Sequence, residues 1–215
     1  MLLYKYRSFD NFEFIADIIL NERLYCAHFE NLNDPCEGIY LQNMWNRYTS
    51  APAGQGPRPE PRRLSSMEHY PEYAKYSNRE RICSLSARID DIRMWSFYSG
   101  NHSGIAFEIE FSDESNLEKI NYMPNLSLYS MSSHLPAPPQ PENILKNKLD
   151  LWSFEEEYRL ITDAEYFSVQ DKIKTIYLGH RFDSRKLALL EKLAPNIPIK
   201  KTWLNPITTK IVVSQ

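Results

Sequence analysis

The segment from Trp152 to Ile161 constrains the fold of this chain most strongly, because it combines dense charge with a two-residue period. In an extended strand, alternate side chains lie on the same face. Glu155, Glu157 and Arg159 would then share one side of the strand. Burying such charges is costly unless they are paired or used. The segment therefore predicts a strand with two carboxylates and a guanidinium aligned along one face.

Two other interpretations of this segment stay open. In a helix, Glu155 and Arg159 would form an i,i+4 ion pair on a solvated face, although the run from Tyr158 to Thr162 is richer in strand-forming residues. In a solvated edge strand, the same two charges would only balance each other. If the face is buried, the two like charges push one carboxyl pKa up and the arginine pulls it down, an arrangement typical of functional sites.

Length and composition favour one self-supporting domain over residues 1–215, since 42% of the residues are hydrophobic and 25% are charged. Two proline-rich stretches, 50–66 and 132–142, are predicted to be irregular connections. The net charge of −3 gives no general attraction for nucleic acid. Nucleic-acid contact would depend on two short basic clusters: Arg58, Arg62 and Arg63, and Lys200 with Lys201.

The three cysteines, Cys26, Cys36 and Cys83, show neither CxxC spacing nor paired histidines, so we expect reduced thiols and no metal site. The N-terminus lacks the apolar core of a signal peptide, and no run reaches the length of a membrane span. We therefore expect a cytoplasmic protein without a membrane partner.

The hydrophobic period predicts an α+β fold with a mixed, largely antiparallel, split sheet and flanking helices. Glu108 and Glu110 are expected on the solvated side of their strand. Asp10, Asp90 and Ser184 are the expected caps of the first, second and last helices. The expected strands are 2–7, 23–28, 81–86, 105–111, 117–122, 173–179, 197–203 and 207–213, and the expected helices are 10–20, 92–98, 142–149 and 184–193.

Several short motifs occur together in a specific order over most of the chain. They are Tyr4-Lys5-Tyr6-Arg7-Ser8, Asn33-Asp34-Pro35 with Glu37, Cys83-Ser84-Leu85-Ser86, Met94-Trp95-Ser96-Phe97-Tyr98, His102-Ser103-Gly104, and Trp152 followed by Glu155, Glu157 and Arg159. In this order they resemble a widespread bacterial family, the domain of unknown function number 2971. The layout of that family is similar to small ADP-ribosyltransferase-like domains.

The resemblance implies an NAD site. Arg7 on the first strand would hold the phosphate or ribose of NAD, and Ser84 and Ser86 would shape the nicotinamide pocket. Glu157, with Glu155 as its helper, would be the catalytic carboxylate. Trp95 or Tyr98 would stack on nicotinamide, and Arg159 would complete the NAD-binding set.

The expected function is therefore that of an ADP-ribosyltransferase-like bacterial toxin or phage-defence effector, with NAD as its substrate. The acceptor would be a protein or a nucleic acid, and an antitoxin or other regulatory protein is a further expected partner. The alternatives are a non-catalytic module that binds a nucleotide or peptide, and a protein that acts on nucleic acid.

Overall fold

The computed structural model describes residues 1–28, 31–34, 39–41, 73–75, 80–112, 116–124 and 145–213, with backbone alone for 39–41 and 73–75. The predicted connections at 50–66 and 132–142 lie outside the described residues, as do the Arg58 to Arg63 cluster and Cys36.

Nine strands form one sheet in the order β15-β14-β13-β7-β1-β6-β11-β8, with β3 pairing to β6. Among the described pairings of this sheet, β13 with β14 is parallel and the others are antiparallel. The prediction of a mixed, mostly antiparallel sheet is confirmed. The strands are β1 (Leu2–Arg7), β3 (Ala27–His28), β6 (Arg81–Ser86), β7 (Ile105–Glu110), β8 (Leu117–Lys119), β11 (Glu157–Thr162), β13 (Ile173–Leu178), β14 (Ile199–Asn205) and β15 (Lys210–Val213).

Three small pairings accompany the main sheet: β2 (Arg23–Tyr25) with β12 (Tyr166–Ser168), β9 (Asn121–Met123) with β10 (Asn147–Leu149), and β4 (Ile39–Leu41) with β5 (Tyr73–Lys75). The described helices are few and short. They are α1 (Phe12–Asn21), α3 (Ile92–Tyr98) and α6 (Leu187–Leu193), with 3₁₀ turns η1 (Phe9–Asn11), η3 (Asp150–Glu155) and η4 (Ser184–Lys186).

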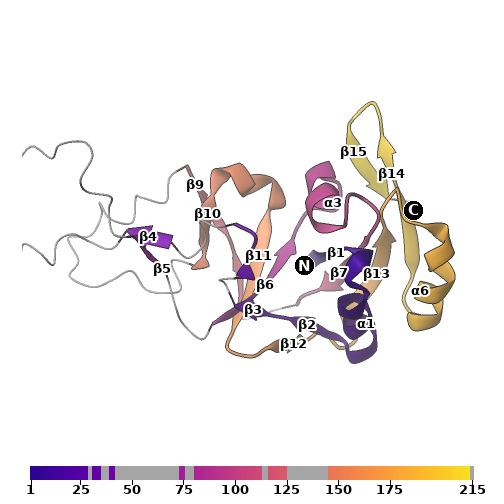
Figure 1. Cartoon of the computed structure of the whole chain (residues 1–215), viewed down its shortest axis with the longest axis horizontal. Coiled ribbons are helices and arrows are strands. Elements are labelled where there is room, and N and C mark those ends of the chain that lie inside the picture. The colour runs from indigo at the N-terminus through magenta and orange to yellow at the C-terminus, as the bar shows by residue number, and fades with distance from the viewer. Residues whose placement is uncertain are drawn as a thin grey trace, which may run out of the picture.

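The helices cover opposite faces of the sheet, because successive side chains along each strand point to opposite faces. On β7, Ile105, Phe107 and Ile109 pack in a core with α1 and α6. Ala106 points the other way and packs in a second core with Trp95 of α3. Figure 1 shows α3 on one side of the central strands and α1 on the other. Apolar side chains at both parities bury β7 on both faces as far as Ile109.

Buried Phe107 gives a direct test of this core. Phe107→Ala should cost about 3–5 kcal/mol of unfolding free energy, because it leaves a cavity where the side chain is 0% exposed. Phe97→Ala on α3, where the ring is 63% exposed, should change stability by about 0.5 kcal/mol or less. Urea denaturation of both variants makes the comparison, and equal losses would contradict this assignment of the core.

The predicted strands 23–28 and 117–122 are each divided in two. Cys26 breaks the first, since its N–H donates to the carbonyl of Glu165 (2.8 Å) and so continues the edge with β12. Ile120 breaks the second, because its N–H donates to the carbonyl of Glu157 (3.0 Å) and its side chain is buried. The predicted helix 142–149 is also wrong over its described end, because residues 147–149 form β10 and pair with β9.

Three predicted caps move by one or two residues. Asp91, not Asp90, caps α3 by accepting from the N–H of Arg93 (2.8 Å). Ser8 caps η1 in place of Asp10, and Asp183 caps η4 in place of Ser184. In each case the capping oxygen accepts from the N–H two residues further on, as expected at an N-terminus. The sequence therefore predicted a polar cap at the start of each helix correctly, but the capping residue lies one or two positions away from the predicted one.

The prediction that both glutamates of β7 are solvated is wrong for Glu108. Glu110 is exposed and pairs with Lys174 (2.9 Å). Glu108 is only 9% exposed, and its Oε1 accepts from the hydroxyls of Tyr4 and Tyr177, each at 3.2 Å. It lies on the same face of β7 as Ala106, where two phenols replace water as hydrogen-bond donors.

Candidate functional site

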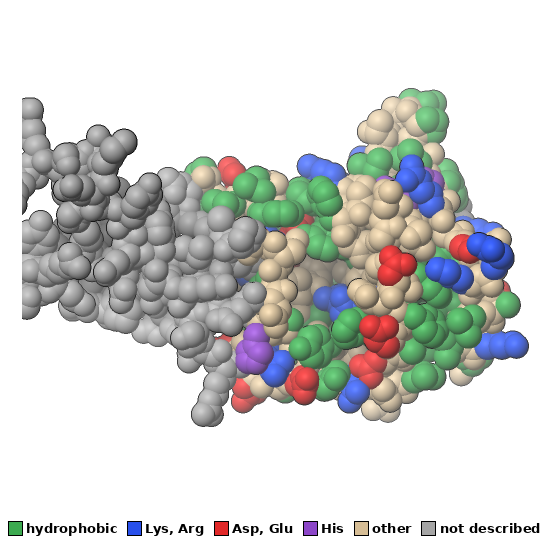
Figure 2. Space-filling view, in the orientation of Figure 1, with side chains coloured by type: hydrophobic (Ala, Val, Ile, Leu, Met, Phe, Trp, Pro, Cys, Tyr) green, Lys and Arg blue, Asp and Glu red, His purple; other side chains and the backbone are tan. Residues whose placement is uncertain are grey.

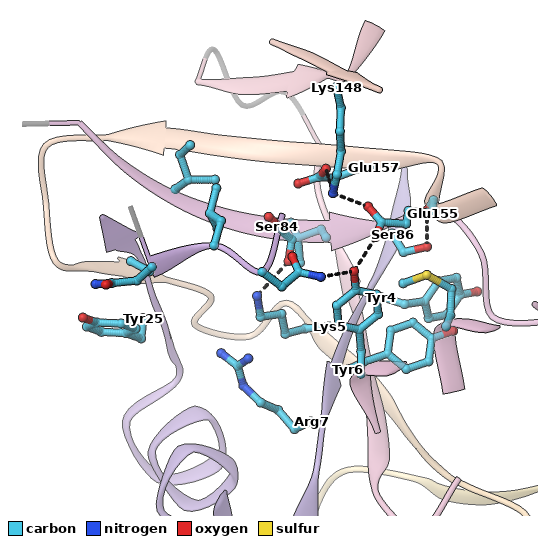
Figure 3. Close-up of a pocket in the computed structure, with 18 residues that line it drawn as sticks. Tyr4, Lys5, Tyr6, Arg7, Tyr25, Ser84, Ser86, Lys148, Glu155 and Glu157 are labelled. Atoms are coloured by element: carbon cyan, nitrogen blue, oxygen red, sulfur yellow. Dashed lines mark hydrogen bonds and ion pairs between the residues drawn. The ribbon is translucent and has the colours of Figure 1, made fainter. Parts of the chain in front are cut away.

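The main sheet opens between β1 and β6. Strand β1 pairs with β7 over six residues but meets β6 at a single pair, Tyr4 with Ser86. Beyond that pair, the ammonium of Lys5 fills the gap and donates to the carbonyl of Ser84 (2.7 Å). In Figure 3, β1 crosses the direction of β6 and β11 rather than running alongside them. The two strands therefore stay paired at Tyr4 and Ser86 and separate beyond that pair.

A cavity of about 260 Å³ lies in this gap. Because the strands separate, side chains from both faces of β1 reach it: Lys5 and Arg7 from the α1 side, and Tyr4 and Tyr6 from the α3 side. In the space-filling view of Figure 2, the described surface is hollowed near its centre and basic atoms are visible inside. The other lining residues are Tyr25, Ala27, Asn31, Leu32, Asn33, Ile82, Ser84, Leu85, Ser86, Met94, Tyr98, Lys148, Glu155 and Glu157.

The acidic side of the cavity is a cluster of four charged groups. The ammonium of Lys148 donates to Glu155 Oε2 (2.6 Å) and to Glu157 Oε2 (3.1 Å). Arg159 donates to both oxygens of Glu157, at 2.7 and 3.0 Å. The hydroxyl of Tyr98 donates to the remaining oxygen of Glu155. All four charged side chains are at most 4% exposed. Two anions and two cations are thus neutralised inside the protein.

The two carboxyl groups have opposite pKa shifts. Burial raises the pKa of Glu155 above its ordinary value, and Lys148 and Tyr98 only partly oppose this. For Glu157, burial also favours the neutral acid, but Arg159 and Lys148 outweigh it and lower the pKa to about 2. Glu157 is therefore a permanent anion near neutral pH, while Glu155 can accept a proton more readily. Carboxyl groups with divergent pKa values are a recurring feature of acid–base sites.

The cationic side of the cavity comes from β1. Lys5 and Arg7 are two residues apart and so lie on the same face. Burial lowers the pKa of both groups. The Nε of Arg7 is buried and has no hydrogen-bond partner among the described residues, and its guanidinium lies 5.6 Å from the ring centre of Phe14. A partly buried guanidinium whose buried Nε–H is unused is suited to an anionic ligand group.

The structure brings most of the predicted site residues together. Arg7, Ser84, Ser86, Tyr98, Glu155 and Glu157 all line the cavity, although they come from separate elements of the fold. Figure 3 shows Arg7 pointing toward the cavity from below, with Glu155 and Glu157 meeting Lys148 on the opposite side. Ser86 also stabilises the wall, because its hydroxyl donates to the carbonyl of Glu155 (2.6 Å) and fixes the end of η3.

Two predicted ligand residues do not line the cavity. Trp95 is 0% exposed in the core beneath α3, where its indole N–H donates to the carbonyl of Ile89 (2.7 Å) and its ring packs edge-on against Tyr6. Arg159 is 1% exposed, and its guanidinium holds Glu157 and the carbonyl of Leu145 (2.8 Å). Trp95 therefore supports the wall from behind, and Arg159 acts on the site through Glu157.

The expectation that the segment from Trp152 to Ile161 forms one extended strand is wrong for the first half of the segment. Residues 150–155 form η3, and Glu155 is the last residue of that 3₁₀ turn. Glu156 follows in the left-handed region (φ 42°) and starts a new direction for β11. Glu155 and Glu157 converge because a turn brings them to the same cation, and Glu156 is left at the surface with Arg88 (2.9 Å).

Lys5 and Lys148 were missed by sequence reasoning. Lys5 had a usable signal, since it alternates with Arg7 along a predicted strand. Lys148 had none, because its segment was assigned to a helix and its acidic partners lie seven and nine residues away through a turn. Local spacing can place carboxylates on one strand face, but it does not reveal a cation that comes from a separate sheet.

No protein-family model matches this chain, and neither a curated protein nor a solved structure does. Within the described ranges, no three His, Cys, Asp or Glu side chains are placed to hold a metal ion. None of the helices in the described part of the chain is both long and apolar enough to cross a membrane.

Proposed function

We propose that this protein is an intracellular bacterial ADP-ribosyltransferase that binds NAD in the β1/β6 cavity and transfers ADP-ribose to a macromolecule, as a toxin or defence effector. The observation that carries the proposal is the convergence of Arg7, Ser84 and Glu157, which are distant in sequence, on one cavity. The separation of β1 from β6 at that cavity supports the ADP-ribosyltransferase-like layout expected from the sequence motifs. The resemblance to domain of unknown function 2971 is part of the same proposal.

The charge distribution suits NAD. The cationic pair Lys5 and Arg7 would receive a phosphate, and the hydroxyl and carboxylate groups opposite would receive ribose. At about 260 Å³ the cavity is slightly below the range of roughly 300–1,000 Å³ that is common for ligand sites. We therefore expect the nicotinamide and its ribose to lie inside, with the adenosine half extending outward. Tyr98 offers a ring beside the nicotinamide, in the role that Trp95 does not fill.

The two carboxyl groups would divide the chemistry. Breaking the bond between ribose C1′ and the nicotinamide nitrogen leaves positive charge on the sugar, and the electron pair departs with neutral nicotinamide. Glu157, ionised by Arg159 and Lys148, would stabilise that charge. The acceptor then attacks C1′ and gives its proton to Glu155, whose raised pKa makes it the better base.

The proposal is tested by incubating the purified protein with a bacterial lysate and NAD that carries a label in its adenosine half. Released nicotinamide together with a labelled macromolecule would support the proposal, and digestion of the product with protease or nuclease identifies the acceptor class. Stabilisation by NAD without nicotinamide release would instead indicate a non-catalytic binding module. On the face of the described residues shown in Figure 2, acidic and basic side chains are interspersed.

Arg7 gives a separate test of the binding mode. Arg7→Met should weaken NAD binding by about 10- to 100-fold, since charged hydrogen bonds contribute roughly 1.5–3 kcal/mol. Arg23→Met removes the same charge from a surface pair with Asp17 (2.9 Å) and should leave the affinity unchanged. Isothermal titration with NAD measures both variants. Equal affinity of Arg7→Met and the unaltered protein would remove Arg7 from the site.

A further inference from the structure

Lys5 is a buried lysine at the cavity whose ammonium has no carboxylate partner among the described residues. The residue is 9% exposed, and its Nζ donates to the main-chain carbonyl of Ser84 (2.7 Å). Lys148 of the same cavity instead holds two carboxylates, those of Glu155 and Glu157, at 2.6 and 3.1 Å. The two lysines therefore differ, because Lys148 is neutralised by anions and Lys5 meets a neutral acceptor.

The position of Lys5 favours the neutral amine. Taking an ammonium out of water is costly unless an anion pairs with it, and a carbonyl does not replace the charge of a carboxylate. Arg7, two residues along the same face of β1, adds a second positive charge. Burial lowers the pKa of Lys5 and Arg7 acts in the same direction, while the thiols of Cys83 and Cys26 oppose them only in part. A desolvated lysine beside another cation is a common form of nucleophilic amine.

Arg7 determines which ligands suit this amine. It lines the same cavity, and its buried Nε–H has no acceptor within the described residues. Figure 3 shows the side chains of Lys5 and Arg7 close together in the gap between β1 and β6. A guanidinium binds phosphate oxygens, and an amine combines with the carbon of an aldehyde. A small ligand that carries both groups would therefore engage both residues.

We propose that Lys5 is a Schiff-base site for a small phosphorylated aldehyde, with Arg7 holding the phosphate. The lone pair of Nζ attacks the aldehyde carbon, so that a C–N bond forms and the carbonyl oxygen takes a proton from the nitrogen. The C–O bond of this carbinolamine then breaks as the C=N bond forms. The departing hydroxide takes the second nitrogen proton and leaves as water. No electrons are exchanged with another molecule. This chemistry goes beyond the proposed transferase and does not depend on it.

The experiment uses the full-length chain and pyridoxal 5′-phosphate in equimolar amount, without NAD. Borohydride then reduces the imine to a stable secondary amine, and peptide mapping by mass spectrometry locates the label. We expect Lys5 to be the main labelled residue, with fragment ions separating it from the α-amine of Met1 in the same peptide. Pyridoxal, which lacks the phosphate, should label Lys5 about 10-fold less at the same concentration, because it cannot form the charged hydrogen bond to Arg7.

Two matched variants test the role of Arg7. Arg7→Met should reduce the labelling of Lys5 by pyridoxal 5′-phosphate about 10-fold and remove the advantage of this reagent over pyridoxal. Arg23→Met removes a guanidinium that pairs with Asp17 at the surface (2.9 Å) and should change neither reagent's labelling. Lys5→Met should lose the main label. Circular dichroism confirms that each variant is folded, and the peptide map of the unaltered chain locates the label by itself if one is not.

Labelling of Lys5 no faster than that of Lys210, whose side chain is 59% exposed, would overturn the proposal. Equal labelling of Lys5 by pyridoxal and pyridoxal 5′-phosphate would overturn the phosphate contact with Arg7. Because the mixture contains no NAD, a failure of the transferase proposal leaves this result unchanged, and an unlabelled Lys5 leaves the transferase proposal standing.

Discussion

Glu157→Gln is expected to reduce nicotinamide release and label transfer by at least about 100-fold, the order lost when a fixed electrostatic group is removed from an active site. Glutamine keeps the shape of the side chain but not its charge. The amide cannot stabilise positive charge on the ribose, and it presents a donor where Arg159 and Lys148 need an acceptor. Nicotinamide release by the purified variant, measured by chromatography, tests the expectation.

Glu156→Gln is the matched control, because it makes the same chemical change one residue earlier. The side chain of Glu156 is 47% exposed and pairs with Arg88 at the surface, outside the cavity. It should retain full activity and nearly full stability. If Glu156→Gln and Glu157→Gln lose activity equally, the cavity is not the reaction site. If neither loses activity, Glu157 has no catalytic role.

The same substitution should change how stability depends on pH. The pKa of Glu157 in the folded protein is about 2, below the value of about 4.3 for an unfolded glutamate. The ionised side chain therefore stabilises the folded state at pH above about 4.3, and this contribution disappears as the pH falls through the folded pKa. The melting temperatures of the unaltered protein and Glu157→Gln should thus converge between about pH 5 and pH 2.

The sequence predicted which residues meet at the cavity better than it predicted the local structure around them. Arg7 and Ser84 were correctly placed on strands because alternation is a local signal. Glu155 and Glu157 were expected together on one strand face, and they do meet, but through η3 and the left-handed Glu156. Within η3, the apolar residues Trp152 and Phe154 alternate with polar neighbours, and this alternation imitates the two-residue period of a strand.

What could not be predicted depends on contacts between distant segments. The gap between β1 and β6 follows from their single pairing, which no local pattern encodes. Cys26 and Cys83 are separated by 57 positions in the sequence, yet both pack in the main core. Trp95 was expected at the ligand because an aromatic residue near a site suits stacking or core equally well. The hydrogen bond from its indole N–H to the carbonyl of Ile89 holds Trp95 in the core.

Lys148→Met should be the most destabilising single change in the site, at a cost of about 3–5 kcal/mol of unfolding free energy, because it removes a cation shared by two buried carboxylates. Methionine preserves the length and apolar stem of the side chain. Without the ammonium, the pKa of Glu155 and that of Glu157 should both rise, since Lys148 lowers each of them. Urea denaturation at neutral pH measures the loss.

Lys146→Met is the matched control two residues away. Lys146 pairs with Glu118 at 2.8 Å, but both side chains are about one-third exposed, so the substitution should cost about 1 kcal/mol or less. Adding Glu155→Gln to Lys148→Met should recover part of the lost stability, because the second change removes a carboxylate that has lost its cation. In the unaltered background Glu155→Gln should instead destabilise. Additive losses in the double variant would contradict the coupling, and would mean that Lys148 supports the fold by packing rather than by holding the two carboxylates together.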